Sequence, residues 1–328
     1  MGNWQTPNNL CSFFSIINNI IIDNDNKDVD LLPNLKVSPS IFIGVDTSGE
    51  HKLAKCQVIS FILCDMSKLG EWFQTVSTIR EIHRLGNRII SYKKLSDIKR
   101  FRALNSFLIS ANNLQGILIT IAIDKSIDSL FEPDGWTEFA SQEPDIFGIY
   151  KRPSLEKFMR IVHFGSFFCA GLAGTNQDIL WISDEDDILP NDKRILLVRE
   201  IIAGISGSYF NSKMGHLRYG VSRSPQNQKT EDLLSIADLA GGAIADHLTD
   251  IHNNMSHLQR NIITIGSTKL PNKAKLILSW FMEKGKPFKR LLFYLGIDDT
   301  TKKYTIKLLN LHKIPHFTIS TMQRKKPT

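Results

Sequence analysis

The most constraining feature of this chain is a set of three apolar, isoleucine-rich runs that each end in an aspartate. The runs and their aspartates are Ile41–Val45 with Asp46, Ile117–Ile123 with Asp124, and Ile179–Ile182 with Asp184. Continuous β-branched runs of this kind are typical of central strands that are covered on both faces. Apolar residues with helical spacing separate the runs, at 66–85, 96–111 and 153–173. This alternation predicts an α/β fold in which helices flank a sheet.

The three aspartates are the first candidates for a functional site. A further apolar run, Val58–Leu63, follows the first one closely and predicts an antiparallel hairpin. If the three strands that end in aspartate are parallel, their carboxylates meet at one edge of the sheet. Carboxylates that meet repel one another unless a cation lies between them, and such hard oxygen ligands select Mg²⁺ or Mn²⁺. The competing interpretation is that each aspartate is an ordinary turn or cap residue.

Asp238 is the fourth candidate, and it lies in a predicted helix over 230–248. Its neighbours are apolar or small, and Gly241 and Gly242 follow it. Glycine inside a helix costs about 1 kcal/mol relative to alanine, which indicates that another element approaches closely there. The helix therefore either carries Asp238 into a site at the sheet edge or packs through its small residues and leaves the carboxylate exposed.

Charge is distributed unevenly along the chain. The formal net charge is +7, but residues 252–328 carry 15 Lys and Arg against 3 acids, a balance of +12. We therefore expect an N-terminal arm or cap at 1–38, the α/β domain at 39–251 and a small basic C-terminal module at 252–328. The basic module suits a polyanion or a protein partner, although such lysines also simply keep a surface soluble. Its aromatic residues form either a stacking surface for bases or a small core; they are Trp280, Phe281, Phe288, Phe293 and Tyr294.

Cysteine usage and hydropathy exclude several classes of protein. The four cysteines, at 11, 56, 64 and 169, show no metal-ligand spacing, so we expect neither a disulfide scaffold nor a structural zinc site. Free cysteines fit a reducing compartment, and we expect a cytoplasmic location. The apolar stretch 13–22 makes a poor signal peptide, because no basic residue precedes it and two asparagines interrupt it. The stretch 158–173 carries Arg160 and His163 and is too short to span a bilayer. His163, Cys64 and Cys169 have no partner motif for catalysis, and we expect them in the core.

Several short motifs resemble, in the same order, those of the bacterial family called domain of unknown function 3800. Asp46-Thr47-Ser48-Gly49 is similar to the family's Asp-Glu-Ser-Gly signature, and Ile236–Ile244 to its Ala-Asp-Leu helix. Shorter similarities lie at 91–95, 121–125, 181–184 and 222–225. The resemblance implies a ribonuclease-H-like fold, a mixed sheet flanked by helices. Thr47 stands where the family usually has glutamate, and Glu50, one turn later, is the candidate substitute.

The resemblance also implies roles for individual residues. Asp46, Asp238 and either Asp124 or Asp184 take the metal-binding roles, with Asp124 on the strand expected beside the first and Glu185 beside Asp184. The lysines near these motifs are either contacts for phosphate oxygens or ordinary solvated lysines, and they are Lys93, Lys94 and Lys125. Lys289 and Arg290 belong to the basic module, which lies outside the resemblance, and are further candidates for contacts with nucleic acid because of their charge.

These observations favour a nuclease that hydrolyses phosphodiester bonds in DNA or RNA with the help of Mg²⁺ or Mn²⁺. The alternative is a non-catalytic nucleic-acid-binding or assembly subunit that keeps the fold, which the change to Thr47 favours. A third interpretation is a small-molecule hydrolase with the same metal site. A role in defence against mobile elements follows from analogy with the family alone.

Overall fold

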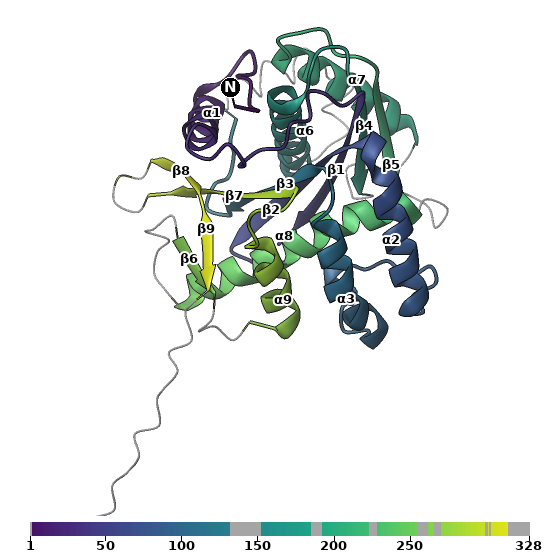
Figure 1. Ribbon diagram of the computed structural model, residues 1–328. Helices are drawn as coiled ribbons and strands as arrows, with labels where there is room; N and C mark the ends of the chain where they lie inside the picture. Colours follow the sequence, from purple (N-terminus) through teal and green to yellow (C-terminus); the bar gives the residue numbers. More distant parts are fainter. Residues whose placement is uncertain are drawn as a thin grey trace, which may run out of the picture.

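A seven-stranded mixed sheet is the centre of the molecule (Figure 1). The computed structural model describes residues 2–131, 152–184, 192–222, 228–254, 262–265, 270–298, 301 and 303–313. The strands, in spatial order, are β5 (Leu217–Ser222), β4 (Asp178–Asp184), β1 (Ser40–Ser48), β2 (Cys56–Asp65), β3 (Gly116–Asp124), β7 (Phe288–Ile297) and β8 (Tyr304–Leu308). β2 and β8 run antiparallel to their neighbours, and the other five strands are parallel to one another.

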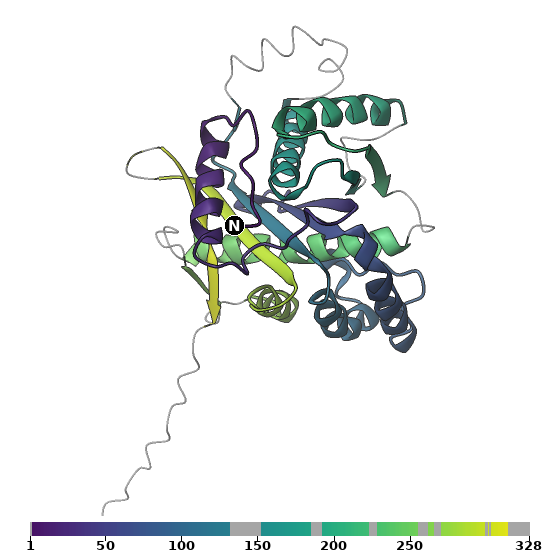
Figure 2. The ribbon, with the colours of Figure 1, turned by 45° about the horizontal axis from the view of Figure 1, so that its top comes forward.

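Helices cover both faces of the sheet, and each face has its own apolar core (Figure 2). One layer consists of α2 (Leu69–Ile82), α3 (Ile98–Ala111), α8 (Gln228–Asn254) and α9 (Asn272–Phe281). The other consists of α1 (Ser12–Asp25), α6 (Arg152–Leu172) and α7 (Asp192–Tyr209). Residues of β1 alternate between the two cores, with Phe42 on the α8 side and Ile41 and Ile43 on the α6 side. The predicted α/β fold with a mixed sheet and flanking helices is confirmed.

Local sequence signals account for the segment between β2 and β3. The turn η1 (Met66–Lys68) leads into α2, and Asp97 caps α3 by accepting hydrogen bonds from the backbone amides of Lys99 and Arg100. Before α3, Ser91 is extended and is followed by the single 3₁₀ turn η2 (Tyr92–Lys94).

β1 and β3 are not neighbours, which corrects the expectation that Asp124 lies beside the first strand. β2 lies between them, and its Ser60 is opposite Asp46 on one side and Thr120 on the other. Asp124 is opposite Cys56, four residues further along the sheet. The parallel neighbour of β1 is β4, in which Ser183 is opposite Val45. The fold therefore brings the backbone of Asp184, rather than that of Asp124, next to Asp46.

The basic C-terminal segment shares this sheet and core instead of standing apart as a module. β7 is hydrogen-bonded to β3, and α9 packs against α8 and α3. The five aromatic residues considered for base stacking are between 0% and 6% exposed, so they belong to the core and offer no stacking surface. Two short strands, β6 (Ile262–Ile265) and β9 (Asn310–Lys313), form a separate parallel pair.

The N-terminal segment is a cap on the α6 side of the sheet. α1 buries Phe14, Ile17 and Ile21 in that core. Trp4 packs against α6 at Gly171, where an added Cβ would lie 2.1 Å from the indole. The glycine thus allows a close approach that fixes the start of the chain.

Candidate active site

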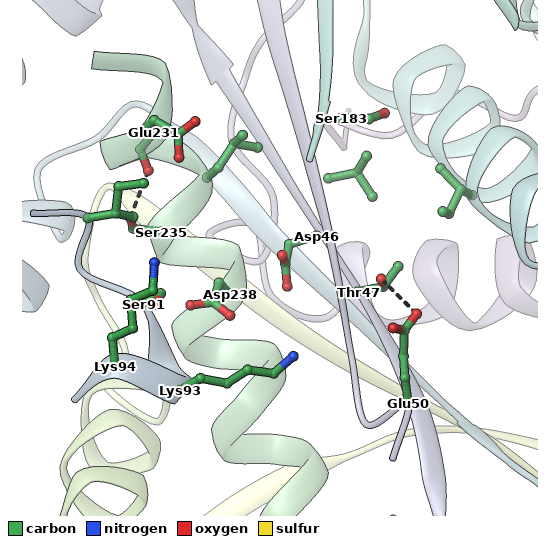
Figure 3. Close-up of a pocket in the computed structure, with 14 residues that line it drawn as sticks. Asp46, Thr47, Glu50, Ser91, Lys93, Lys94, Ser183, Glu231, Ser235 and Asp238 are labelled. Carbon is green, nitrogen blue, oxygen red and sulfur yellow. Dashed lines mark hydrogen bonds between the residues drawn. The ribbon is translucent and has the colours of Figure 1, made fainter. Parts of the chain in front are cut away.

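A cavity of about 340 Å³ lies near the ends of β1 and β4, beside α8 and the η2 turn (Figure 3). The polar residues that line it are Asp46, Thr47, Glu50, Ser91, Lys93, Lys94, Ser183, Glu231, Ser235 and Asp238. Segments far apart in the sequence meet here because β1 and β4 are parallel neighbours and α8 packs across β1 and β2. This is the edge at which the parallel strands end, where ligands bind in open α/β sheets.

Asp46 reaches the cavity from β1 and is 7% exposed. The period of two residues in a strand places it on the face covered by α8, as it does Phe42. The hydroxyl of Ser48 lies 3.4 Å from Asp46 Oδ2 and donates to it. α8 lies close to the sheet here, because a Cβ added to Gly241 would be 3.0 Å from Ser60 Oγ. The close approach predicted from the paired glycines is confirmed.

Asp238 faces the same cavity from α8. Its Oδ2 accepts a hydrogen bond of 2.6 Å from the backbone amide of Tyr92, the first residue of η2. Figure 3 shows the carboxylates of Asp46 and Asp238 on either side of one space, with Lys93 extending from η2 towards it. The structure thus brings together two of the aspartates singled out in the sequence, one from each end of the resemblance.

Glu50 also lines the cavity, but other residues hold it. Thr47 donates its hydroxyl to Glu50 Oε1 at 3.2 Å, and Lys157 Nζ of α6 lies 2.5 Å from the same oxygen. Thr47 therefore orients Glu50. The Glu50 side chain is 52% exposed, so its ion pair with Lys157 contributes little to stability.

Asp184 has the right backbone position for the same site. It is the last residue of β4 and pairs with Ser222 of β5, one residue beyond the pairing of Ser183 with Val45. Its side chain, the neighbouring Glu185 and the 223–225 part of the loop motif lie outside the described residues.

Asp124 does not line the cavity, because β2 separates it from Asp46. Its Oδ2 lies 3.1 Å from His252 Nε2 and 3.0 Å from Tyr294 Oη, and its Oδ1 accepts from the amide of Ser126 at 2.8 Å. Burial raises the pKa of Asp124, but these hydrogen bonds outweigh it and hold the pKa well below its ordinary value. Asp124 is therefore ionised and engaged at a second place on the sheet edge.

The candidate phosphate-binding residues divide between the two edges of the sheet. Lys93 and Lys94 line the cavity, whereas Lys125 donates to the carbonyl of His51 at 2.8 Å and lines a different hollow. Lys289 and Arg290 lie at the start of β7, opposite Ile117 and Leu118, and so at the edge away from the cavity. The Arg290 guanidinium lies 4.2 Å from the centre of the Trp280 ring, and burial lowers its pKa to about 10. Arg290 therefore stabilises the core rather than extending towards a ligand.

The core residues behave as the sequence indicates. Burial lowers the pKa of His163 to about 4, and its Nδ1 lies 2.9 Å from the Tyr209 hydroxyl. Cys64 and Cys169 are buried, which raises the pKa of each thiol. Throughout the part of the chain that the structure describes, no helix has both the length and the apolarity to cross a membrane.

Sequence reasoning missed Tyr92, Glu231 and Ser235 as residues of the site. Ser235 and Glu231 precede Asp238 on α8 by three and seven residues, so helical spacing from Asp238 was the available signal. Tyr92 acts through its backbone amide, which no pattern of side chains indicates.

Comparisons with known proteins add a distant structural similarity. No family model matches the sequence, and no curated protein matches it. The structure is similar to the crystal structure of the ribonuclease H2 from Pyrococcus horikoshii OT3, with a TM-score of 0.33 and 12% identity, over 74% of this chain and 85% of that chain. The resemblance to the domain of unknown function 3800 family stays a prediction, and the residues of the cavity carry the functional argument.

Proposed function

We propose that this chain is a nuclease that hydrolyses phosphodiester bonds with Mg²⁺ or Mn²⁺ bound between Asp46 and Asp238. The observation that carries the proposal is that these two carboxylates, from β1 and α8, face one cavity. Carboxylates brought together disfavour each other's ionisation, and a divalent cation removes that penalty. Their oxygens are the ligands that both cations prefer.

The donor set fits such an ion but is incomplete in the described residues. Among these residues, no three His, Cys, Asp or Glu side chains are grouped as a metal site. We take Asp184 as the third ligand, because its backbone lies on the strand next to Asp46, with Glu185 beside it. A bound ion would supply a more acidic water and would offset charge on the leaving oxygen.

The remaining residues of the cavity suit a phosphodiester. Lys93 and Lys94 line it from η2, so each would bind a non-bridging phosphate oxygen as a point charge. Because Asp46 is 7% exposed, its carboxylate is poorly solvated, and its interactions with nearby charges are stronger than in water. The cavity thus combines acidic residues for a cation with basic residues for an anionic substrate.

The alternative function is a non-catalytic subunit that binds nucleic acid through the same cavity. It is favoured by the contacts of Glu50, whose Oε1 is held by Thr47 and Lys157 rather than by the aspartates. An acid that is neutralised in this way contributes little to a metal site.

A cleavage assay separates these functions. Labelled single- and double-stranded DNA and RNA and an RNA–DNA hybrid are incubated with the full chain and Mg²⁺, Mn²⁺ or a chelator. We expect metal-dependent cleavage of at least one substrate. Cleavage should fall roughly 100-fold or more in Asp46→Asn and Asp238→Asn, because each removes a charged ligand of the cation that would offset charge at the reacting phosphate. Asp30→Asn is the matched control, since Asp30 is exposed on the N-terminal segment.

The other outcomes point elsewhere. Binding of a nucleic acid with no cleavage under any condition would favour the non-catalytic subunit. Cleavage of bis(p-nitrophenyl) phosphate without cleavage of any polymer would favour the small-molecule hydrolase. Undiminished cleavage in Asp46→Asn would contradict the assignment of this cavity as the active site.

A further inference from the structure

We infer that Tyr92 positions the carboxylate of Asp238, and that Asp246 and Lys273 hold Tyr92 in place. The inference rests on the proposed function, because it names the residues that orient one of the proposed metal ligands. The 2.6 Å hydrogen bond from the Tyr92 amide to Asp238 Oδ2 is charge-assisted and therefore strong. The donor belongs to the backbone of η2, so the orientation of the Asp238 carboxylate depends on the position of Tyr92.

The side chain of Tyr92 is fixed along one face of α8. Asp238, Gly242 and Asp246 are spaced four residues apart and therefore share that face. Tyr92 Oη donates to Asp246 Oδ2 at 2.5 Å, and the ring lies over Gly242, where an added Cβ would be 2.4 Å from it. Burial, and then the bond to Asp246, raise the pKa of the phenol, so the donated proton stays on Tyr92. The amide and the hydroxyl thus bind α8 on opposite sides of Gly242.

Lys273 of α9 makes the third contact. Its Nζ donates to the Tyr92 carbonyl at 3.0 Å and lies 3.9 Å from the centre of the Tyr92 ring. A cation at this distance is attracted by the electron-rich face of the ring. Lys273 therefore holds both the backbone and the ring of the residue whose amide orients Asp238. Through this lysine the C-terminal segment reaches the candidate active site.

The surroundings of Tyr92 leave room for it to move when one of these contacts is lost. A second cavity, of about 250 Å³, adjoins the first at Asp238 and is lined by Tyr92, Asp246 and Lys273. Lys93 and Glu50 line both cavities. A displaced Tyr92 would carry its amide away from Asp238 and change the direction of the carboxylate.

Calorimetric titration with Mn²⁺, together with the cleavage assay on the full chain, tests this inference. Tyr92→Phe keeps the amide and the ring but loses the bond to Asp246. We expect its Mn²⁺ affinity and its kcat to fall roughly tenfold, the lower end of what loss of a group that orients a metal ligand costs. Tyr294→Phe is the matched control, because it loses a 3.0 Å hydroxyl bond to Asp124 outside the cavity. It should be less stable but keep wild-type Mn²⁺ affinity and kcat.

Variants of Lys273 provide a second test that does not depend on Tyr92 itself. Lys273→Arg keeps a cation near the ring and the carbonyl, and should retain most of the Mn²⁺ affinity. In Lys273→Met the Mn²⁺ affinity should fall roughly tenfold, as in Tyr92→Phe. Wild-type Mn²⁺ affinity and kcat in both Tyr92→Phe and Lys273→Met would overturn the inference and leave the proposed function intact. A wild-type chain that neither binds Mn²⁺ nor cleaves would overturn both.

Discussion

Asp124 Oδ2 and His252 Nε2 lie 3.1 Å apart, and this contact joins the end of β3 to the last turn of α8. The other ring nitrogen of His252 lies 2.9 Å from the carbonyl of Leu248. An ionised carboxylate and a carbonyl can only accept hydrogen bonds, so both ring nitrogens donate and His252 is protonated. Asp124 therefore forms an ion pair that holds the end of β3 against the last turn of α8.

This ion pair predicts a pH window of stability. The hydrogen bond to Asp124 raises the pKa of His252 above 6.5, so its contribution is complete below pH 6.5 and is lost as pH rises through the raised pKa. Asp124 has a pKa held below 3.8, so its contribution is present above pH 3.8 and is lost as pH falls towards the lowered pKa. The Tm of the wild type minus that of His252→Gln should therefore be largest between pH 3.8 and pH 6.5, and should become smaller at lower and at higher pH. A difference that does not change with pH would contradict the pair.

Gly242→Ala should lower the free energy of unfolding by about 1–3 kcal/mol, as a methyl group forced into a close contact does. The reason is that the new methyl group would lie 2.4 Å from the Tyr92 ring. Gly204→Ala on α7 is the control, because nothing lies within 4 Å of its Cβ position. It should instead raise the stability by about 0.5–1 kcal/mol, since alanine is the better helix former. Urea unfolding measures both, and equal effects would show that α8 and η2 are not in close contact.

Arg80→Met should be among the most destabilising substitutions in the chain. Arg80 forms a 2.6 Å ion pair with Asp232, and the two side chains are 8% and 4% exposed. It also donates to the carbonyls of Gly86 and Arg88, which lead into η2. Removing the guanidinium leaves a buried charge unpaired, at about 3–5 kcal/mol. Arg102→Met, on the exposed side of α3, is the control. Its free energy of unfolding in urea should stay within about 0.5 kcal/mol of that of the wild type.

The two groups of lysines should differ in their effect on nucleic-acid binding. Lys93→Gln and Lys94→Gln should each weaken binding and reduce the salt slope by about one, as the loss of one phosphate contact does. Lys289→Gln should change neither quantity, since Lys289 lies at the other edge of the sheet. Fluorescence anisotropy at several salt concentrations measures both. A reduced salt slope in Lys289→Gln alone would indicate that the nucleic acid binds at the edge of the sheet where Lys289 lies.

The elements of the fold were largely predictable because each has a local signal. Isoleucine-rich runs mark β1, β3 and β4, and the paired glycines of α8 mark its contact with the sheet. Strand order has no such signal, since β3 and β4 are both apolar runs that end in aspartate and either satisfies a place beside β1. Only the pairing of β2 with both β1 and β3 decides it, and that pairing moves Asp124 away from Asp46.

The prediction of a separate basic module at the C-terminal end rested on the net charge of a long segment. The balance of +12 conceals the run Leu291–Leu295, which is buried in β7 and pairs with β3. Charge describes the surface of a segment and does not show whether its apolar residues join an existing core. The contacts of Tyr92 were equally hidden, because they join its amide and hydroxyl to residues more than 140 positions away.

Anomalous diffraction from a crystal soaked in Mn²⁺ is the most direct test of a metal site between β1 and α8. We predict an anomalous peak within about 2.3 Å of a carboxylate oxygen of both Asp46 and Asp238, a bonding distance for a hard cation and oxygen ligands. The same peak should be absent from crystals of Asp46→Asn. A peak at Asp124 instead, or no peak near Asp46 and Asp238 at saturating Mn²⁺, would contradict the site.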